Sequence, residues 1–238
     1  MKSGVYSILR KEQTAPEGKN MFGKDHHTDD SFNIRTMLTF CMLAFICGCN
    51  TPGAPESIMT PAVKMPEWLY RVESEHLNKS MTDEEKMRFV ISLALENVDR
   101  GTGGPFGAAI FEIATGKLVA AGVNSVVPAN QSWAHAEMTA FARAQMLRQS
   151  FDLKGCMLVT SCEPCAMCFG ATPWSGVEQM LYGAPGDFAR EIGFDEGDKV
   201  SDWHSALEKR GIKVTGPMLP DEAKVPFTLY HQKTGKIY

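Results

Sequence analysis

The chain has 238 residues, of which 44% are hydrophobic and 22% are charged. This size and balance fit one globular domain with a sizeable core, together with an additional segment. The formal net charge of −4 argues against a nucleic-acid partner, because such proteins usually carry a basic surface. The seven cysteines are odd in number and clustered along the sequence, which argues against a disulfide framework.

Residues 1–65 differ in composition from the rest of the chain. Residues 1–32 are polar and have no apolar periodicity, so we expect them to be disordered. Residues 37–47 form an almost wholly apolar run that follows Arg35. A bilayer-spanning helix needs roughly 20 apolar residues, so this run is too short to span a membrane but suits the hydrophobic region of a signal peptide.

The sequence Ile46-Cys-Gly-Cys49 resembles a bacterial lipobox. In this interpretation Cys49 is acylated and becomes the mature N-terminus, and residues 50–57 form a flexible tether. The long acidic stretch before Arg35 departs from the pattern, and a start codon at Met21 would remove that departure. The sequence therefore predicts a lipid-anchored extracytoplasmic protein. The alternative is a cytoplasmic protein in which the apolar run is a short buried helix or part of a disordered segment.

The predicted folded domain, residues 66–238, alternates between helices and strands. Thr82 and Glu85 form a capping box ahead of a helix whose apolar face runs to Val98. The other predicted elements are, in chain order, strands at 106–113 and 118–123 joined as a hairpin, a helix at 134–148, a strand at 156–160, a helix from 164, a strand at 179–182, a helix at 202–210, a strand at 212–215 and a helix at 221–233. This order predicts an α/β domain with a mixed sheet covered on both faces.

Two motifs carry the candidate chemistry. His135-Ala-Glu137 opens the helix after the hairpin, and Pro164-Cys-Ala-Met-Cys168 opens the helix after the next strand. Proline is common at the first helical position, so we place the start of the second helix at Pro164. Both helices should begin at the same edge of the sheet, and we therefore expect His135, Cys165 and Cys168 to converge.

One imidazole and two thiolates are typical of a tetrahedral zinc site with one open position. Three protein ligands indicate a catalytic site, whereas four would indicate a structural one. Water in the open position has its pKa lowered to about 7. Glu137 lies beside a ligand but is not itself one, which suits a general acid and base. We predict one Zn²⁺ per chain.

Other interpretations of the cysteines remain open. A Cys-x-x-Cys pair alone could belong to a zinc ribbon or to a redox centre. The ribbon needs a second such pair, and the redox centre needs no histidine. Cys162 could also act as a fourth ligand, which would make the site structural. The chain would then be a lipid-anchored binding protein and not an enzyme.

The two motifs, in this order, match the signature of zinc-dependent deaminases. The chain resembles the cytidine-deaminase-like superfamily and, within it, the bacterial guanine deaminases. The resemblance runs from about residue 87 to the end of the chain, and it rests also on the segments 103–108, 122–124, 160–171 and 192–197. It implies a three-layer α/β/α fold with a mixed central sheet, and a homodimer.

The resemblance also implies roles for individual residues. Glu196 would be a second catalytic carboxylate that contacts the base. The residues implied in substrate binding are Asn124, Phe106, Ala136, Trp174 and Tyr238, the last of which belongs to a C-terminal segment that closes over a site. Each has a simpler interpretation: a strand cap for the asparagine, core packing for the phenylalanine and tryptophan, and a frayed terminus for the tyrosine.

These features predict hydrolysis of an exocyclic amino group on a heterocyclic base, with guanine converted to xanthine and ammonia. A tRNA-specific adenosine deaminase would need basic phosphate contacts, which the composition does not indicate. Cytosine, an aminotriazine or a nucleoside remain alternative substrates, because a small pocket separates isosteres poorly. We expect a small purine or related base as the partner, no nucleic acid, and membrane contact only through an anchor at Cys49.

Overall fold

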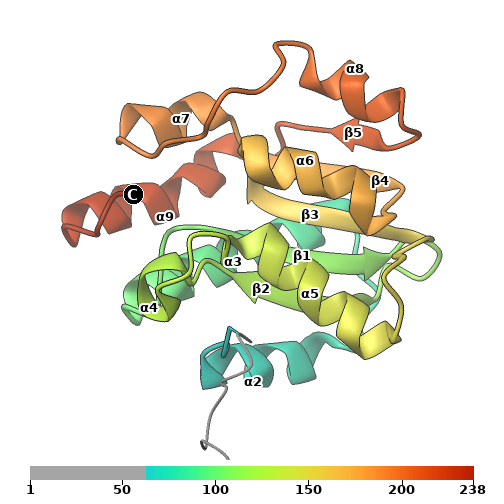
Figure 1. Ribbon diagram of the computed structural model, residues 1–238. Helices are drawn as coiled ribbons and strands as arrows, with labels where there is room; N and C mark the ends of the chain where they lie inside the picture. The colour runs from blue at the N-terminus through green and yellow to red at the C-terminus, as the bar shows by residue number, and fades with distance from the viewer. Residues whose placement is uncertain (1–62) are drawn as a thin grey trace, which may run out of the picture. The chain divides into compact units, whose positions relative to one another are not determined.

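The five strands within residues 63–238 form one mixed sheet in the order β2-β1-β3-β4-β5 (Figure 1). The computed structural model describes residues 63–238, and our predictions for the N-terminal segment lie outside this range. β1 (Gly107–Glu112) pairs antiparallel with both β2 (Leu118–Val123) and β3 (Cys156–Cys162). β4 (Gln179–Ala184) and β5 (Lys213–Thr215) extend the sheet in parallel with β3. The predicted α/β class and mixed sheet are confirmed.

Long helices cover both faces of the sheet, which gives the domain three layers (Figure 1). On one face, α3 (Asp83–Asp99) and α9 (Pro220–Gln232) pack against each other and against the central strands. On the opposite face lie α5 (Ala136–Arg148) and α6 (Ala166–Ser175). The loops that lead into α5 and α6 therefore meet on one side of the sheet.

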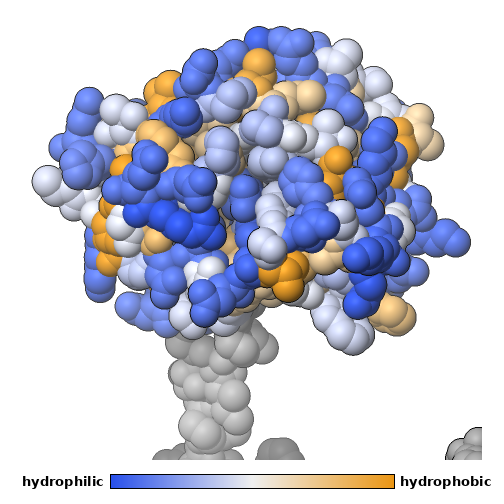
Figure 2. Space-filling view, turned by 90° about the horizontal axis from the view of Figure 1, so that it is seen from above, coloured by the Kyte–Doolittle hydropathy of each residue, from blue (hydrophilic) through white to orange (hydrophobic). Residues whose placement is uncertain are grey.

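Alternation along the strands produces two separate cores. In β1, Ala109 and Phe111 belong to the core under α3, whereas Ala108 and Ile110 belong to the core under α5. Successive side chains of a strand point to opposite faces, so one strand supplies both cores. All four side chains are fully buried. On the face seen in Figure 2, hydrophobic residues are scattered among hydrophilic ones.

Four further helices complete the described part of the chain. They are α2 (Glu67–His76), α4 (Val126–Ala129), α7 (Gly186–Glu191) and α8 (Trp203–Glu208). Only α8 was predicted from the sequence; α2, α4 and α7 were missed. Within residues 63–238, every helix is too short or too polar to cross a membrane.

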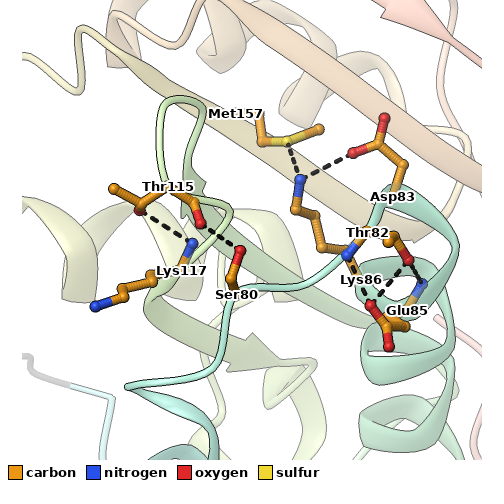
Figure 3. A network of polar contacts seen from close by, with 8 residues as sticks. All are labelled: Ser80, Thr82, Asp83, Glu85, Lys86, Thr115, Lys117 and Met157. Carbon is orange, nitrogen blue, oxygen red and sulfur yellow. Dashed lines mark hydrogen bonds and ion pairs between the residues drawn. The ribbon is translucent and has the colours of Figure 1, made fainter.

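Two helix starts differ in how well the sequence predicted them. The capping box is confirmed: the Glu85 N–H donates to Thr82 Oγ1 at 3.3 Å, and the Thr82 N–H donates to Glu85 Oε2 at 2.8 Å (Figure 3). The predicted helix start at Pro164 is wrong, because α6 begins at Ala166 with Cys165 as its N-cap. Cys165 itself has an extended backbone, and Pro164 precedes it outside the helix.

Side chains of α2 and α5 bind the outer edge of β2. The Ala121 N–H donates to Glu73 Oε1 at 2.6 Å, and Arg143 Nη1 donates to the Ala121 carbonyl. The two side chains also form an ion pair through Arg143 Nη2 and Glu73 Oε2. The Arg143 guanidinium lies 4.8 Å from the centre of the Tyr70 ring. These contacts attach α2 to the sheet.

Candidate active site

His135 and Cys165 are the N-caps of α5 and α6, the two helices on one face of the sheet. Cys168 lies in the first turn of α6 and is fully buried. The possible ligand atoms of these three residues all lie within 4.8 Å of one another. The structure therefore brings together the three residues that the sequence proposed as metal ligands.

The donor set fits zinc, because one imidazole nitrogen and two sulfurs leave a tetrahedral ion with one open position. A hydrogen bond from Cys168 lowers the pKa of the Cys165 thiol to about 4, which favours the thiolate that binds metal. Cys162 lies outside this group, and its Sγ is 4.0 Å from the carbonyl oxygen of Pro185. Within residues 63–238 there is no second cluster of this kind.

Glu137 lies in the first turn of α5, and only 5% of it is exposed. Its Oε1 accepts a hydrogen bond from Thr160 Oγ1 at 3.3 Å. Burial raises the pKa of Glu137, and the negative charge of Cys165 raises it further. A carboxyl group whose pKa is raised toward neutrality can both accept and release a proton.

A small cavity of about 30 Å³ opens onto two of the ligands, His135 and Cys165, and onto Glu137. Its walls include three aromatic rings: Phe106 and Phe194 lie 5.0 Å apart, and Phe194 and Tyr238 lie 5.4 Å apart between ring centres. The Tyr238 ring also lies 6.4 Å from the His135 ring, so the C-terminal segment lies beside the ligand. These rings give the cavity aromatic walls beside two of the ligands.

Glu196 also lines this cavity, although it follows Glu137 in the sequence by a long interval. It is 7% exposed, and burial raises its pKa to about 8, with further contributions from the charges of Cys165 and Glu137. Two carboxyl groups thus face the same small space. Like charges in a confined site favour a shared proton over two ionised groups.

Asn124 follows β2 and is buried. Its Oδ1 accepts from the Val126 N–H at 3.3 Å, whereas its buried Nδ2 has no hydrogen-bond partner among residues 63–238. Tyr238 Oη is likewise buried without a partner in this part of the chain. A Cβ atom at Gly104 would lie 3.0 Å from Asn124 Oδ1 and 3.1 Å from Tyr238 Oη. Glycine therefore permits both side chains to approach closely.

Two other predicted substrate residues lie elsewhere. Trp174 is 80% exposed and does not line the cavity of this chain, and its role in substrate binding stays a prediction. It comes six residues after Cys168 in a helix with 3.6 residues per turn, which rotates it away from the ligand. Ala136 is the first residue of α5 and is fully buried beside His135, but it is not among the cavity walls.

Three further residues line the cavity that the sequence analysis did not select: Glu163, Phe194 and Asp195. Each is adjacent in sequence to a selected residue or motif, since Glu163 lies inside Cys162-Glu-Pro-Cys165 and the other two directly precede Glu196. Their position next to these motifs was the sequence feature that could have indicated a place in the site. Asn97 was also missed; from α3 it donates to the backbone carbonyl of Asn124 at 2.9 Å.

Comparisons with known proteins agree with this geometry. A family model described as the cytidine and deoxycytidylate deaminase zinc-binding region matches residues 80–184. Guanine deaminase of Bacillus subtilis (strain 168) is 39% identical over 132 residues, which are 56% of this chain and 83% of that protein. A probable cytosine deaminase of Schizosaccharomyces pombe is 32% identical over 145 residues, 59% of this chain and 86% of the other.

Comparison with solved structures also finds deaminases of similar sequence and fold. Guanine deaminase from Nitrosomonas europaea is 40% identical with a TM-score of 0.69, and the match covers 74% of this chain and 100% of that one. A structure in complex with 2,6-diaminopurine is 41% identical with a TM-score of 0.70, covering 75% and 96% of the two chains. The fold and the zinc-ligand geometry define a hydrolytic deaminase that acts on the C–N bonds of nucleobases. The chain belongs to the zinc-dependent cytidine and deoxycytidylate deaminase family.

Proposed function

We propose that this protein converts guanine and water to xanthine and ammonia. The observation that carries the proposal is the meeting of Glu137 and Glu196 in one aromatic cavity beside the zinc ligands. The buried Asn124 side chain is not one of its walls but lies near Tyr238, which is. Similarity to guanine deaminases over most of their length supports it. The similar protein solved with 2,6-diaminopurine supports a purine base as the ligand.

His135, Cys165 and Cys168 would hold the zinc ion, which would act as a Lewis acid and lower the pKa of the attacking water. The chain itself moves the protons. Glu137 takes a proton from the attacking water at its carboxylate and delivers one to a ring nitrogen. It then takes the remaining proton from the new hydroxyl group on that carbon and transfers it to the departing amino group, so that a C=O bond forms and ammonia leaves. Its burial keeps bulk water from competing for these protons.

Glu196 and Asn124 recognise the base in this proposal. Burial raises the pKa of Glu196 to about 8, so its carboxyl group can hydrogen-bond to the base and exchange a proton with it near neutral pH, which a glutamine amide cannot do. Asn124 Nδ2 is a buried donor, and a base carbonyl or ring nitrogen would satisfy it. Phe106 and Tyr238 flank the ring, and Tyr238 lies over the cavity as part of a C-terminal segment that closes on bound substrate.

Similarity to guanine deaminases over most of their length supports a free base over a tRNA nucleotide as the substrate. Ammonia release from guanine, cytosine and tRNA with adenosine at its editing position tests the proposal. We expect guanine to give the highest kcat/KM. A higher value for cytosine or for tRNA would overturn the assignment while leaving the deaminase chemistry intact.

We also propose that the protein is a homodimer. Trp174 and Met167 are exposed apolar residues of α6, and Met146 and Leu147 are exposed at the end of α5, on the same face of the sheet. Exposed apolar groups that gather on one face are typical of an association surface. Light scattering should give the mass of a dimer, and Trp174→Glu should give a monomer.

Finally, we propose that residues 1–65 are a leader and tether and that residues 66–238 are the deaminase domain. The lipobox-like Ile46-Cys-Gly-Cys49 supports acylation of Cys49 and a site outside the cytoplasm. Labelling with a fatty-acid analogue should mark the wild type but not Cys49→Ser. An unlabelled wild-type protein with an intact N-terminus would reject the anchor.

A further inference from the structure

Lys199 is a buried lysine beside the cavity, and its side chain is only 5% exposed. Its Nζ forms an ion pair with Glu163 Oε1 and donates to the Pro164 carbonyl at 2.7 Å. The same nitrogen lies 4.6 Å from the centre of the Trp203 ring. A buried ammonium is stable only when its hydrogen-bonding groups are paired, so these contacts fix it in one position.

Glu163 connects this lysine to the metal-binding turn. It follows the end of β3, lines the cavity and directly precedes Pro164 and the ligand Cys165. Its second oxygen, Oε2, accepts from the Gly186 N–H at 3.3 Å. Both carboxylate oxygens are therefore occupied, and Lys199 offsets the charge of Glu163 in a site that is also lined by the carboxyl groups of Glu137, Asp195 and Glu196.

Glu196 lies in a segment, residues 194–200, that has neither helix nor strand. The segment is attached before and after Glu196. Phe194 packs on Phe106 and on Tyr238, and Lys199 forms the contacts described above. Between them, the Glu196 carbonyl accepts from the Ala166 N–H of α6 at 2.8 Å. The position of the Glu196 side chain thus depends on both attachments.

We infer that Lys199 is a positioning residue for Glu196, because its ion pair with Glu163 fixes the 194–200 segment against the metal-binding turn. This inference rests on the proposed function, in which Glu196 contacts the base. Displacing a recognition group by about 1 Å can reduce a rate by roughly 100-fold. Lys199 therefore acts on the reaction without touching the substrate.

The test is Lys199→Met, which removes the charge and retains the length of the side chain. Lys86→Met is the matched control. Lys86 is also a buried lysine, with a side chain 7% exposed, and its Nζ contacts Asp83 at 2.8 Å and Met157 Sδ at 3.4 Å (Figure 3). It lies in the first turn of α3 and meets the beginning of β3, whereas the site lies at the other end of that strand.

We expect Lys199→Met to retain zinc and to lower kcat/KM for guanine by about 10- to 100-fold. It should also reduce the preference for guanine over cytosine, as Glu196→Gln should. Lys86→Met should keep kcat/KM within about twofold even where it lowers the melting temperature. An unchanged kcat/KM and substrate ranking in Lys199→Met would overturn the inference, and so would an equal loss in both lysine variants.

Two double variants distinguish the loss of Glu196 positioning from general damage to the fold. Lys199→Met/Glu163→Gln leaves no unpaired carboxylate, so it should fold even where the single variant does not. It should still show the loss of guanine preference; recovery to wild-type kinetics would overturn the inference. Lys199→Met/Glu196→Gln should be no slower than Glu196→Gln alone, because two changes that act through one group are not additive. Additive losses would mean that Lys199 acts independently of Glu196.

The same series distinguishes this inference from the proposed function. If Glu196→Gln leaves the guanine rate and ranking unchanged, the recognition role of Glu196 fails and the inference fails with it. If Glu196→Gln changes both but Lys199→Met changes neither, the recognition role stands and only the inference about Lys199 is rejected.

Discussion

The Nδ1 atom of His135 lies 3.5 Å from the Sγ atom of Cys165, a residue 30 positions further along the chain. Each residue is the N-cap of its helix, and the two helices lie side by side on one face of the sheet. The contact therefore follows from the topology, because β2 and β3 deliver the two helix starts to the same place. His135 and Cys165 could therefore hold one metal ion together, and such an ion would link the starts of the two helices.

Cys165→Ala should abolish zinc binding, because it removes one of only three protein ligands. Cys162→Ser should retain one zinc per chain, since Cys162 lies outside the ligand group. Elemental analysis of the purified variants measures both outcomes. X-ray absorption of the wild type should show two sulfur ligands and one imidazole nitrogen, with an oxygen in the fourth position; three sulfurs would make Cys162 a ligand and the site structural.

Glu137→Gln should keep the shape of the side chain and the bound zinc but cannot accept a proton. General acid–base catalysis typically contributes roughly 10²- to 10⁴-fold, and Glu137 serves more than one transfer, so kcat should fall by about 10⁴-fold or more. Steady-state kinetics of guanine hydrolysis, with zinc content measured on the same sample, checks this. A variant with full zinc and a kcat within tenfold of wild type would remove Glu137 from the proposed mechanism.

Glu196→Gln should change selectivity more than metal content. The substitution alters one hydrogen-bonding partner of the base, and mismatched buried polar groups cost affinity for the preferred substrate. We expect kcat/KM for guanine to fall while that for cytosine changes less. Parallel assays of guanine, cytosine and adenosine give the ranking, and an unaltered ranking counts against a guanine-specific site.

Tyr238→Phe should separate substrate binding from stability. The Tyr238 hydroxyl is buried and has no hydrogen-bond partner among residues 63–238, so its removal should not lower the melting temperature. If the hydroxyl contacts the base, KM for guanine should nevertheless rise. Tyr238→Ala is the companion variant, because it also removes the ring beside His135. Equal KM values in wild type and Tyr238→Phe would limit the role of Tyr238 to packing.

Arg143→Met should destabilise the domain without changing the chemistry. The Arg143 and Glu73 side chains are only 17% and 8% exposed, and removing one partner of a buried pair costs about 3–5 kcal/mol. Urea denaturation should show this loss, and kcat of the folded fraction should be unchanged. Glu73→Gln/Arg143→Met should recover part of the lost stability, because no unpaired charge then remains.

The sequence was sufficient to predict features that rest on local patterns. The Thr82–Glu85 capping box appears with both of its hydrogen bonds, and β2 has the predicted bounds of 118–123. The three ligands converge as expected, because their placement needs only two strand–helix junctions on one side of a sheet. Hydrophobic periodicity and the helix-capping residues specify these features, and distant residues are not needed for them.

Features that depend on distant contacts were not predicted. α2 is stabilised by residues far along the chain. Trp68 donates a hydrogen bond to Thr102, and Glu73 forms an ion pair with Arg143. At the start of α7, Pro185 is the N-cap and Gly186 is the first helical residue. A Pro-Gly pair, considered without its surroundings, is typical of a turn. The ion pair between Lys199 and Glu163 joins residues 36 positions apart, and no local signal indicates it. The secondary-structure propensities of neighbouring residues contain no information about pairs that lie so far apart in the sequence.

The side chains that bind the backbone of Ala121 also affect whether the sheet can pair with a strand of another molecule. An outer strand with free N–H and C=O groups is a template on which a strand of another molecule can assemble. At β2, Glu73 and Arg143 occupy the outward N–H and C=O of Ala121, and Thr139 Oγ1 donates to the Val123 carbonyl at 3.2 Å. At the other margin, β5 has only three residues and begins with a lysine. The domain is therefore protected at both margins against intermolecular strand addition, the route by which sheet proteins polymerise.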